Sequence, residues 1–242
     1  MDMKDSLKGW RRLASALGAV VGLMVLTAIA FAQDNPNPRV LPIHSSPFGN
    51  TYGEWSARWW QWLLSVPAAT NPVNDSTGAQ CAQGQTGKVW FLAGTFVGAV
   101  TRTCTVPQGK ALFFPIENAT FGAAVGDCEP TAPGVRCVEV VLRAAAAASM
   151  DSVTLEGSID GVPLLDLSDY RVQSPVFSVT VPEGNLVGIP SGTYTPMVSD
   201  GYWLMLAPLA AGAHTIHFKN SITGGPFAGT ATEVTYHLTI GP

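Results

Sequence analysis

Two histidines and one glutamate near the C-terminus are the residues whose types best suit acid–base or metal chemistry. Side chains alternate along the strands predicted at 214–219 and 234–240, which puts His217, His237 and Glu233 on the polar faces of those strands. If the two strands are neighbours, all three side chains lie on one solvent face. Two imidazoles and a carboxylate suit a divalent transition metal or an acid–base pair. Polar residues on the wet face of a sheet are also expected without any function. We therefore predict no metal and no other cofactor, and keep the three as weak metal-ligand candidates.

A second candidate pair, Glu54 and Arg58, stands four residues apart in a predicted helix. This pair could position a general acid or anchor a ligand carboxylate. The same residues have a structural explanation, because Thr51-x-x-Glu54 is a capping box and Glu and Arg at this spacing form an ordinary helix ion pair.

Asp200-Gly201-Tyr202-Trp203 places a carboxylate beside two aromatic rings that could line a binding cleft. The alternative is that Asp-Gly forms a tight turn and that one aromatic enters the core. From these segments we take Glu54, Arg58, Asp200 and His217 as candidate catalytic residues.

Tryptophans dominate the segment 51–66. At helical spacing Trp55, Trp59 and Trp62 share one face, as expected of a helix packed on a sheet. Trp60 lies off that face and could form a platform for a sugar ring. The candidate ligand-binding residues are therefore Trp60, Tyr202 and Trp203.

The elements that must position these residues form a mainly β chain with two helices. Helices are predicted at 51–66, where Pro67 ends the first, and at 138–150, where a run of alanines favours the second. Asp160-Gly161 and Pro107-Gln108-Gly109-Lys110 are predicted hairpin connections. Short alternating or apolar runs predict strands at 89–96, 100–106, 111–116, 153–159, 162–165, 176–181, 202–206, 214–219 and 234–240. We expect an antiparallel β-sandwich, jelly-roll-like or Ig-like, with helices packed at one side.

The N-terminus has the features of a secretory signal peptide. Lysines and arginines precede an uncharged apolar run from Leu13 to Ala32, which ends Ala30-Phe31-Ala32. We predict cleavage after Ala32; the alternative is a retained membrane anchor, since a run of this length spans a bilayer. The domain organisation is then a signal peptide (1–32), a Pro-rich extended arm (33–49) and one disulfide-stabilised sandwich domain (50–242).

The chain has four cysteines, all after the leader: Cys81, Cys104, Cys128 and Cys137. An even number in an exported protein predicts disulfides. Of the three pairings we favour Cys81–Cys104 and Cys128–Cys137, which close short loops. Zinc is disfavoured because the sequence has no C-x-x-C motif and no histidine nearby.

Composition excludes several classes of protein. The chain has 242 residues, of which 47% are hydrophobic and 12% charged, and a formal net charge of −4. This composition does not fit a disordered chain or a nucleic-acid-binding surface. The sequence also lacks a Gly-x-Ser-x-Gly elbow, a His-Glu-x-x-His motif and a phosphate-binding Walker loop.

Two stretches resemble a family of exported bacterial proteins of uncharacterised function. One holds Tyr52-Gly53-Glu54-Trp55 with Trp59-Trp60-Gln61-Trp62, followed by Gly94-Thr95-Phe96 and Cys104-Thr105-Val106-Pro107. The other holds Asp200-Gly201-Tyr202-Trp203, then Gly212-Ala213-His214-Thr215-Ile216-His217-Phe218 and Tyr236-His237-Leu238. The resemblance spans most of the chain after the leader. It implies an exported bacterial protein and assigns no chemistry.

Two hypotheses follow. We favour an exported protein, periplasmic or extracellular, with a non-catalytic binding or envelope-associated role. Its partner would be a small molecule, a glycan or an envelope protein, with no nucleic acid, and it would meet the membrane only through the signal segment before cleavage. The alternative is a small secreted hydrolase or lyase that uses the carboxylate and histidine candidates.

The export hypothesis predicts the covalent state of the native protein. We expect mass spectrometry of the purified native protein to find a chain that begins at Gln33 and carries two disulfides. An intact Met1, or four free thiols, would contradict both the predicted cleavage and the predicted oxidation.

Overall fold

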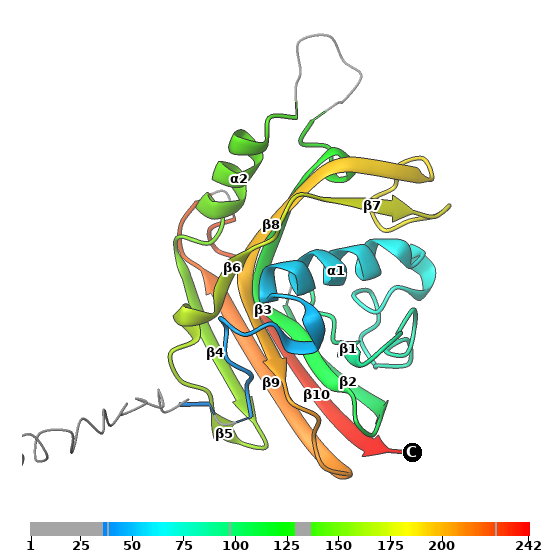
Figure 1. Cartoon of the computed structure of the whole chain (residues 1–242), viewed down its shortest axis with the longest axis vertical. Coiled ribbons are helices and arrows are strands. Elements are labelled where there is room, and N and C mark those ends of the chain that lie inside the picture. Colours follow the sequence, from blue (N-terminus) through cyan, green and yellow to red (C-terminus); the bar gives the residue numbers. More distant parts are fainter. Residues whose placement is uncertain (1–35, 38, 97, 129–136, 226) are drawn as a thin grey trace, which may run out of the picture. The chain divides into compact units, whose positions relative to one another are not determined.

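Two five-stranded sheets pack face to face in the part of the chain that the structure describes (Figure 1). The computed structural model describes residues 36, 37, 39–96, 98–128, 137–225 and 227–242, which all belong to one compact unit. The predicted signal peptide lies outside these residues. The strands are β1 (Val89–Phe91), β2 (Gly98–Pro107), β3 (Ala111–Gly122), β4 (Val153–Ile159), β5 (Val162–Pro163), β6 (Arg171–Gln173), β7 (Phe177–Val181), β8 (Gly192–Leu206), β9 (Gly212–Ile222) and β10 (Ala231–Gly241).

The helices match the predicted positions. They are α1 (Tyr52–Ser65) and α2 (Glu139–Ala148), with 3₁₀ turns η1 (Pro47–Gly49), η2 (Ala68–Thr70), η3 (Ala123–Val125) and η4 (Leu167–Tyr170). A capping box between Thr51 and Glu54 starts α1, as the sequence predicts.

The mainly β sandwich with two helices is confirmed, but its sheets are mixed. Sheet I has the order β1-β3-β8-β6, with β7 also paired to β8, and sheet II has the order β2-β10-β9-β4-β5. The pairs β1–β3 and β2–β10 are parallel, so the sandwich is not purely antiparallel. Parallel strands that pair are joined by long connections. Hairpin signals in a sequence indicate only pairs of strands that are consecutive in the chain, so they could not predict these parallel pairs. The Asp160-Gly161 turn does join the antiparallel pair β4–β5, whereas residues 107–110 connect β2 and β3, which lie in different sheets.

Helix α1 covers the outer face of sheet I through its aromatic side chains. The ring centroids of Trp59 and Trp203 are 5.4 Å apart, and Trp203 stacks on Phe113 at 5.2 Å. The backbone of α1 also approaches β6 closely, because a Cβ on Gly53 would lie 2.4 Å from the carbonyl oxygen of Gln173. These contacts fix the helix on β3, β8 and β6.

The inner face of sheet I packs against sheet II, where the rings of Phe114 and Phe218 stack at 5.1 Å. Helix α2 lies on this same inner side. Its Leu142 packs with Val198 of β8. The next residue of β8, Ser199, faces the other side of the sheet, where its hydroxyl lies 3.4 Å from that of Ser56 in α1. The two helices therefore lie on opposite faces of sheet I and not at one side of the sandwich. Periodicity shows that a helix buries a face but not which face of a sheet receives it.

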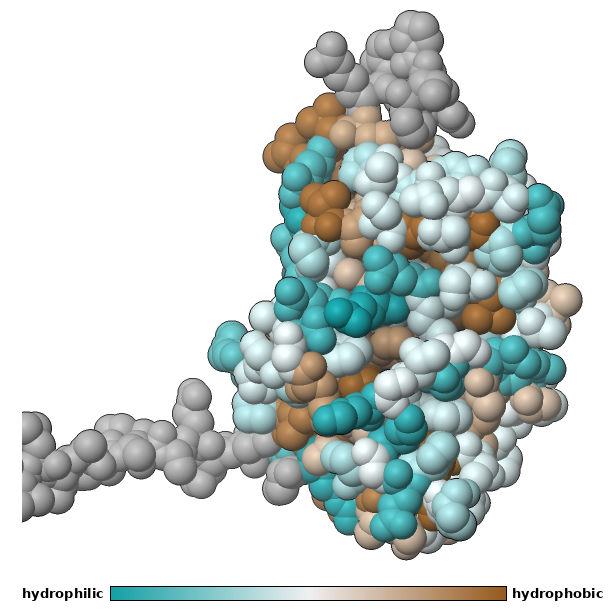
Figure 2. All heavy atoms as spheres, turned by 45° about the vertical axis from the view of Figure 1, so that its right-hand side comes forward, coloured by the Kyte–Doolittle hydropathy of each residue, from teal (hydrophilic) through white to brown (hydrophobic). Residues whose placement is uncertain are grey.

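The surface of α2 carries exposed hydrophobic side chains. Val138, Val140 and Val141 are 42%, 70% and 62% exposed. Figure 2 shows hydrophobic surface gathered at the upper end of the face it presents.

Several strands are longer than predicted, and in β3 and β8 the difference concerns the site. Strand β3 continues beyond the predicted end at Ile116 as far as Gly122. The predicted Asp200-Gly201 turn is wrong, because both residues lie inside β8. A Cβ on Gly201 would lie 2.6 Å from the Cβ of Asn118 and 2.7 Å from the carbonyl oxygen of Glu117. Glycine is needed here for close strand approach and not for a turn.

The favoured disulfide pairing is confirmed: Cys81 bonds to Cys104 and Cys128 bonds to Cys137. The described residues contain no helix long and apolar enough to cross a membrane.

A buried arginine fixes the connection that precedes β2. Arg102 is 1% exposed and donates hydrogen bonds to the carbonyl oxygens of Asp75, Ala93 and Gly94, at 2.6, 2.7 and 2.9 Å, and to the hydroxyl of Tyr236 at 2.9 Å. Charge-assisted hydrogen bonds of this kind satisfy the buried cation and the carbonyl groups together. The loop at Gly94 is thereby held against sheet II.

Candidate functional site

Glu54 and Arg58 lie on the exposed side of α1 and have local roles. One oxygen of Glu54 accepts hydrogen bonds from the backbone N–H of Thr51 at 2.7 Å and from its hydroxyl at 3.0 Å. These bonds lower the pKa of Glu54. The guanidinium of Arg58 lies 5.4 Å from the centre of the Trp55 ring. Glu54 also lines a wide depression of about 610 Å³ that includes His44.

Asp200 is buried in β8 and is fully occupied by partners. Arg171 donates to both of its carboxylate oxygens, at 3.0 and 3.1 Å, and Gln173 donates at 3.0 Å. These bonds with Asp200 raise the pKa of Arg171. The arrangement is that of a buried ion pair that joins β6 to β8.

The two predicted C-terminal strands are neighbours, and His217, His237 and Glu233 share the outer face of sheet II. Nε2 of His217 lies 3.0 Å from Oε1 of Glu233, whereas Nδ1 of His237 lies 3.4 Å from the hydroxyl of Thr215. In the described part of the chain no group of three His, Cys, Asp or Glu side chains is placed to hold a metal ion.

The aromatic candidates divide between the core and a cavity. Trp203 is completely buried, and Tyr202 is buried with its hydroxyl 3.2 Å from the carbonyl oxygen of Met150. Trp60 is 7% exposed and lines a cavity of about 460 Å³. The four catalytic candidates, Glu54, Arg58, Asp200 and His217, do not line this cavity.

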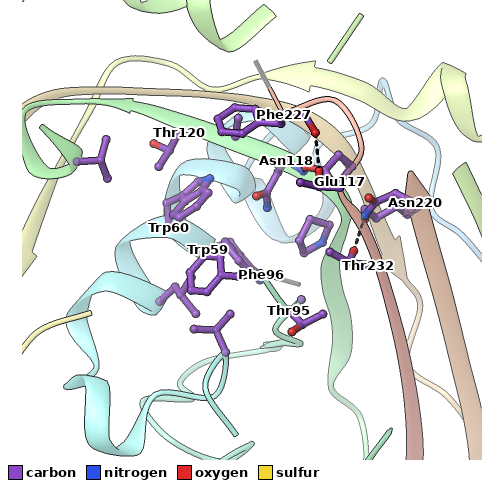
Figure 3. A pocket seen from close by; sticks show the side chains of 18 of the residues that line it. Trp59, Trp60, Thr95, Phe96, Glu117, Asn118, Thr120, Asn220, Phe227 and Thr232 are labelled. Carbon is purple, nitrogen blue, oxygen red and sulfur yellow. Dashed lines mark hydrogen bonds between the residues drawn. The ribbon is translucent and has the colours of Figure 1, made fainter. Parts of the chain in front are cut away.

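The cavity lies between the second half of α1, the free edge of β3, the loop at Gly94–Phe96 and the ends of β9 and β10 that approach it (Figure 3). Strand β1 pairs with β3 only as far as Phe113, so the described residues of β3 beyond this point have a strand neighbour on one side only. A bulge between Pro115 and Glu117 shifts the register with β8. Bulges of this kind re-aim side chains, and this one precedes the polar pair Glu117 and Asn118.

Three buried polar atoms on residues that line the cavity have no hydrogen-bond partner among the described residues. They are Nε1 of Trp60, Nδ2 of Asn118 and Oδ1 of Asn220. The other three tryptophans of α1 donate to backbone carbonyls: Trp55 to Pro47, Trp59 to Leu92 and Trp62 to Gln83. Trp60 is thus the one indole of this helix whose N–H has no such acceptor among the described residues.

Asn220 joins the two sides of the cavity. Its Nδ2 donates to the carbonyl oxygen of Ile116 at 2.8 Å and to the hydroxyl of Thr232 at 2.6 Å. The amide group is therefore fixed, and its Oδ1 has no partner among the described residues.

Glu117 is a half-buried carboxyl group at the wall of the cavity. Its Oε1 accepts a hydrogen bond from the backbone N–H of Asn118 at 3.0 Å, beside the ring of Phe227 (Figure 3). Burial among apolar groups raises the pKa of Glu117 to about 7, against the opposing effect of that hydrogen bond. A raised pKa in a concave site is a common feature of functional carboxyl groups.

The sequence analysis missed Glu117, Asn118 and Asn220. One signal was present for the first two: a charged residue and an amide directly follow the apolar run 111–116. Ending the predicted strand at Ile116 placed both in a loop. No local pattern marked Asn220, because its role depends on the packing of β9 against β3.

No protein-family model matches the chain, and no curated protein matches it. Among solved structures the chain is similar to PbICP-C, from the structure of PbICP-C in complex with falcipain-2, with 12% sequence identity and a TM-score of 0.24. The match covers 64% of this chain and 99% of that chain. A TM-score of this size does not indicate a common fold, so the similarity assigns neither structure nor function.

Glu117 makes stability depend on pH. Because its pKa is raised in the folded state, the folded protein binds the proton more tightly than the unfolded chain, and stability falls as pH rises from about 4.5 to about 7. We expect Glu117→Gln to stabilise the protein by up to about 3 kcal/mol at pH 8 and by less than about 1 kcal/mol at pH 5, measured by urea denaturation.

Glu156→Gln is the matched control, since Glu156 is exposed on β4. We expect it to change stability little at either pH. Equal effects of Glu117→Gln at the two pH values would contradict the raised pKa.

Proposed function

We propose that this protein is a binding protein of an oxidising, exported compartment, and that its ligand is a small molecule held in the cavity between α1 and β3. Two disulfides indicate an oxidising environment. Export by a cleaved leader, in the periplasm or the medium, is part of the proposal. So is the relationship to the exported bacterial family that the sequence resembles.

The observation that carries the proposal is the gathering of partnerless polar atoms in one cavity. A buried donor or acceptor without a partner costs about 1–3 kcal/mol, and native proteins contain few of them. Here Trp60, Asn118 and Asn220, which line the same cavity, each carry one such atom. A ligand that offers a complementary donor or acceptor would satisfy at least one group that the described part of the fold leaves without a partner.

The size and lining of the cavity fit a small organic ligand. A volume of about 460 Å³ lies within the range of small-molecule sites, which are mainly apolar with a few convergent polar groups. Leu63, Leu64, Ile116 and Phe218 supply apolar wall here.

The alternative enzyme hypothesis has less support in this site. Glu117 is a carboxyl group of suitable pKa, but the lining residues that the structure describes include no Ser, Cys or His. These residues therefore offer no Ser–His or Cys–His pair of the kind in which a base activates a nucleophile. Glu54 and Asp200 are engaged in a helix cap and a buried ion pair.

A glycan remains a candidate ligand class within this proposal. Sugar recognition on an aromatic platform needs an accessible ring face, and Trp203 offers none because it is completely buried. Trp60 is the aromatic candidate that lines the cavity and could contact a sugar there.

Binding can be tested with N-phenyl-1-naphthylamine, an uncharged probe whose fluorescence rises in apolar surroundings. We expect one saturable site on the oxidised mature protein. Thr120→Trp fills space beside Trp60, as Thr120 lines the same cavity (Figure 3), and we expect it to weaken probe binding about tenfold or more, since overfilling a packed site is unfavourable.

Thr101→Trp is the matched control, because Thr101 is exposed on β2 and does not line the cavity. Circular dichroism verifies that both variants are folded. Absence of saturable probe binding, or equal loss in both folded variants, would contradict the proposed site. Displacement of the probe by neutral sugars would identify the ligand class as glycan.

A further inference from the structure

The charged groups of the cavity all have one sign. Its described lining residues include two carboxyl groups, Glu117 and Asp127, and no Lys, Arg or His. Asp127 is exposed at the rim, where it accepts a hydrogen bond from the N–H of Gly122 at 2.9 Å. A concave site lined by one sign of charge concentrates ligands of the opposite sign.

Glu117 has no cationic partner among the described residues. The ion pairs in this part of the chain all lie elsewhere, and the single hydrogen bond given to its carboxylate comes from the backbone of Asn118. A carboxylate in apolar surroundings is normally paired or protonated. Above its pKa of about 7, Glu117 therefore carries a charge that no described cationic group balances.

Aromatic rings supply the remainder of a cation-binding environment. Ammonium groups bind aromatic faces with a favourable electrostatic energy, which increases when water is excluded. Figure 3 shows Trp60, Phe96 and Phe227 around the space near Glu117. The aromatic residues that line the cavity are Trp59, Trp60, Phe96, Phe121, Phe218 and Phe227.

We propose that the ligand is an organic cation, an ammonium group on an apolar body, with the ammonium against Glu117 and the body against the aromatic and aliphatic wall. This inference rests on the proposed binding function and specifies its ligand class.

The arrangement makes binding depend on pH. With a pKa of about 7, Glu117 is ionised above neutrality and protonated below it, so affinity for the cation falls as pH decreases. Asp127 is the other titratable group that faces the cavity. Four other parts of the chain contribute described residues to the lining: α1, β9, β10 and the loop at Gly94–Phe96. These residues are aromatic, aliphatic, amide, hydroxyl or glycine residues.

The test displaces bound N-phenyl-1-naphthylamine with three probes of similar shape and different charge. These are 2-phenylethylamine as the cation, 2-phenylethanol as the neutral form and 3-phenylpropanoate as the anion. At about pH 8 we expect the amine to displace the fluorophore at a concentration about tenfold or more below that of the alcohol, with the anion weakest. At about pH 5.5 we expect most of this advantage to be lost.

Glu117→Gln keeps the shape of the side chain and removes its charge. We expect it to abolish the advantage of the amine over the alcohol while the affinity for the alcohol changes by less than about threefold. Glu156→Gln, on the exposed face of β4, should leave all three affinities unchanged.

The outcomes separate the two proposals. If the fluorophore binds in the cavity but amine and alcohol displace it equally, or the amine keeps its advantage in Glu117→Gln, the cation inference is overturned and the binding function stands. If the fluorophore does not bind the wild-type protein, the binding function itself fails.

Discussion

The packing of α1 on sheet I is the interaction on which the rest of the structure depends. Trp59 meets Trp203 edge to face, and Trp203 stacks on Phe113, so helix and sheet share one continuous aromatic layer. Each of these side chains buries a large apolar area, and the capping box at Thr51 and Glu54 fixes where the helix begins. With the helix held in this place, its second half forms one wall of the cavity and β3 forms another.

The chemistry of that space comes from the part of β3 that departs from regular pairing. Beyond Phe113 the strand loses its β1 neighbour, and a bulge directly precedes Glu117 and Asn118, which both line the cavity. Gly201 makes this possible, since any side chain there would collide with both residues. A half-buried acid with a raised pKa reduces stability at neutral pH. Such a cost without a structural benefit is typical of a functional site.

Much of the fold could be predicted from the sequence, because its determinants are local. The capping box and aromatic spacing located α1, the even cysteine count with short loops gave the disulfide pairing, and Asp160-Gly161 located a hairpin. Parallel neighbours and the opposite faces taken by the helices could not be predicted, since they depend on contacts between distant segments. The site was missed for the same reason: Glu117 looks like the end of a strand, and Asn220 acquires its role only where β9 meets β3. Trp60 was selected because it lies off the buried stripe, and it lines the cavity.

The indole N–H of Trp60 reports on the central claim most directly, because Trp60 lines the cavity and its Nε1 has no partner among the described residues. Trp90 provides an internal reference, since its buried Nε1 also lacks a partner and it does not line the cavity. The measurement is a titration of the oxidised mature protein with 2-phenylethylamine, followed in ¹⁵N–¹H spectra. The variants Trp60→Phe and Trp90→Phe assign the two indole signals. The account predicts that the Trp60 indole signal shifts to saturation while that of Trp90 stays in place. A Trp60 signal that does not move at ligand concentrations that saturate displacement of the fluorophore, or one that moves no more than the Trp90 signal, would contradict it.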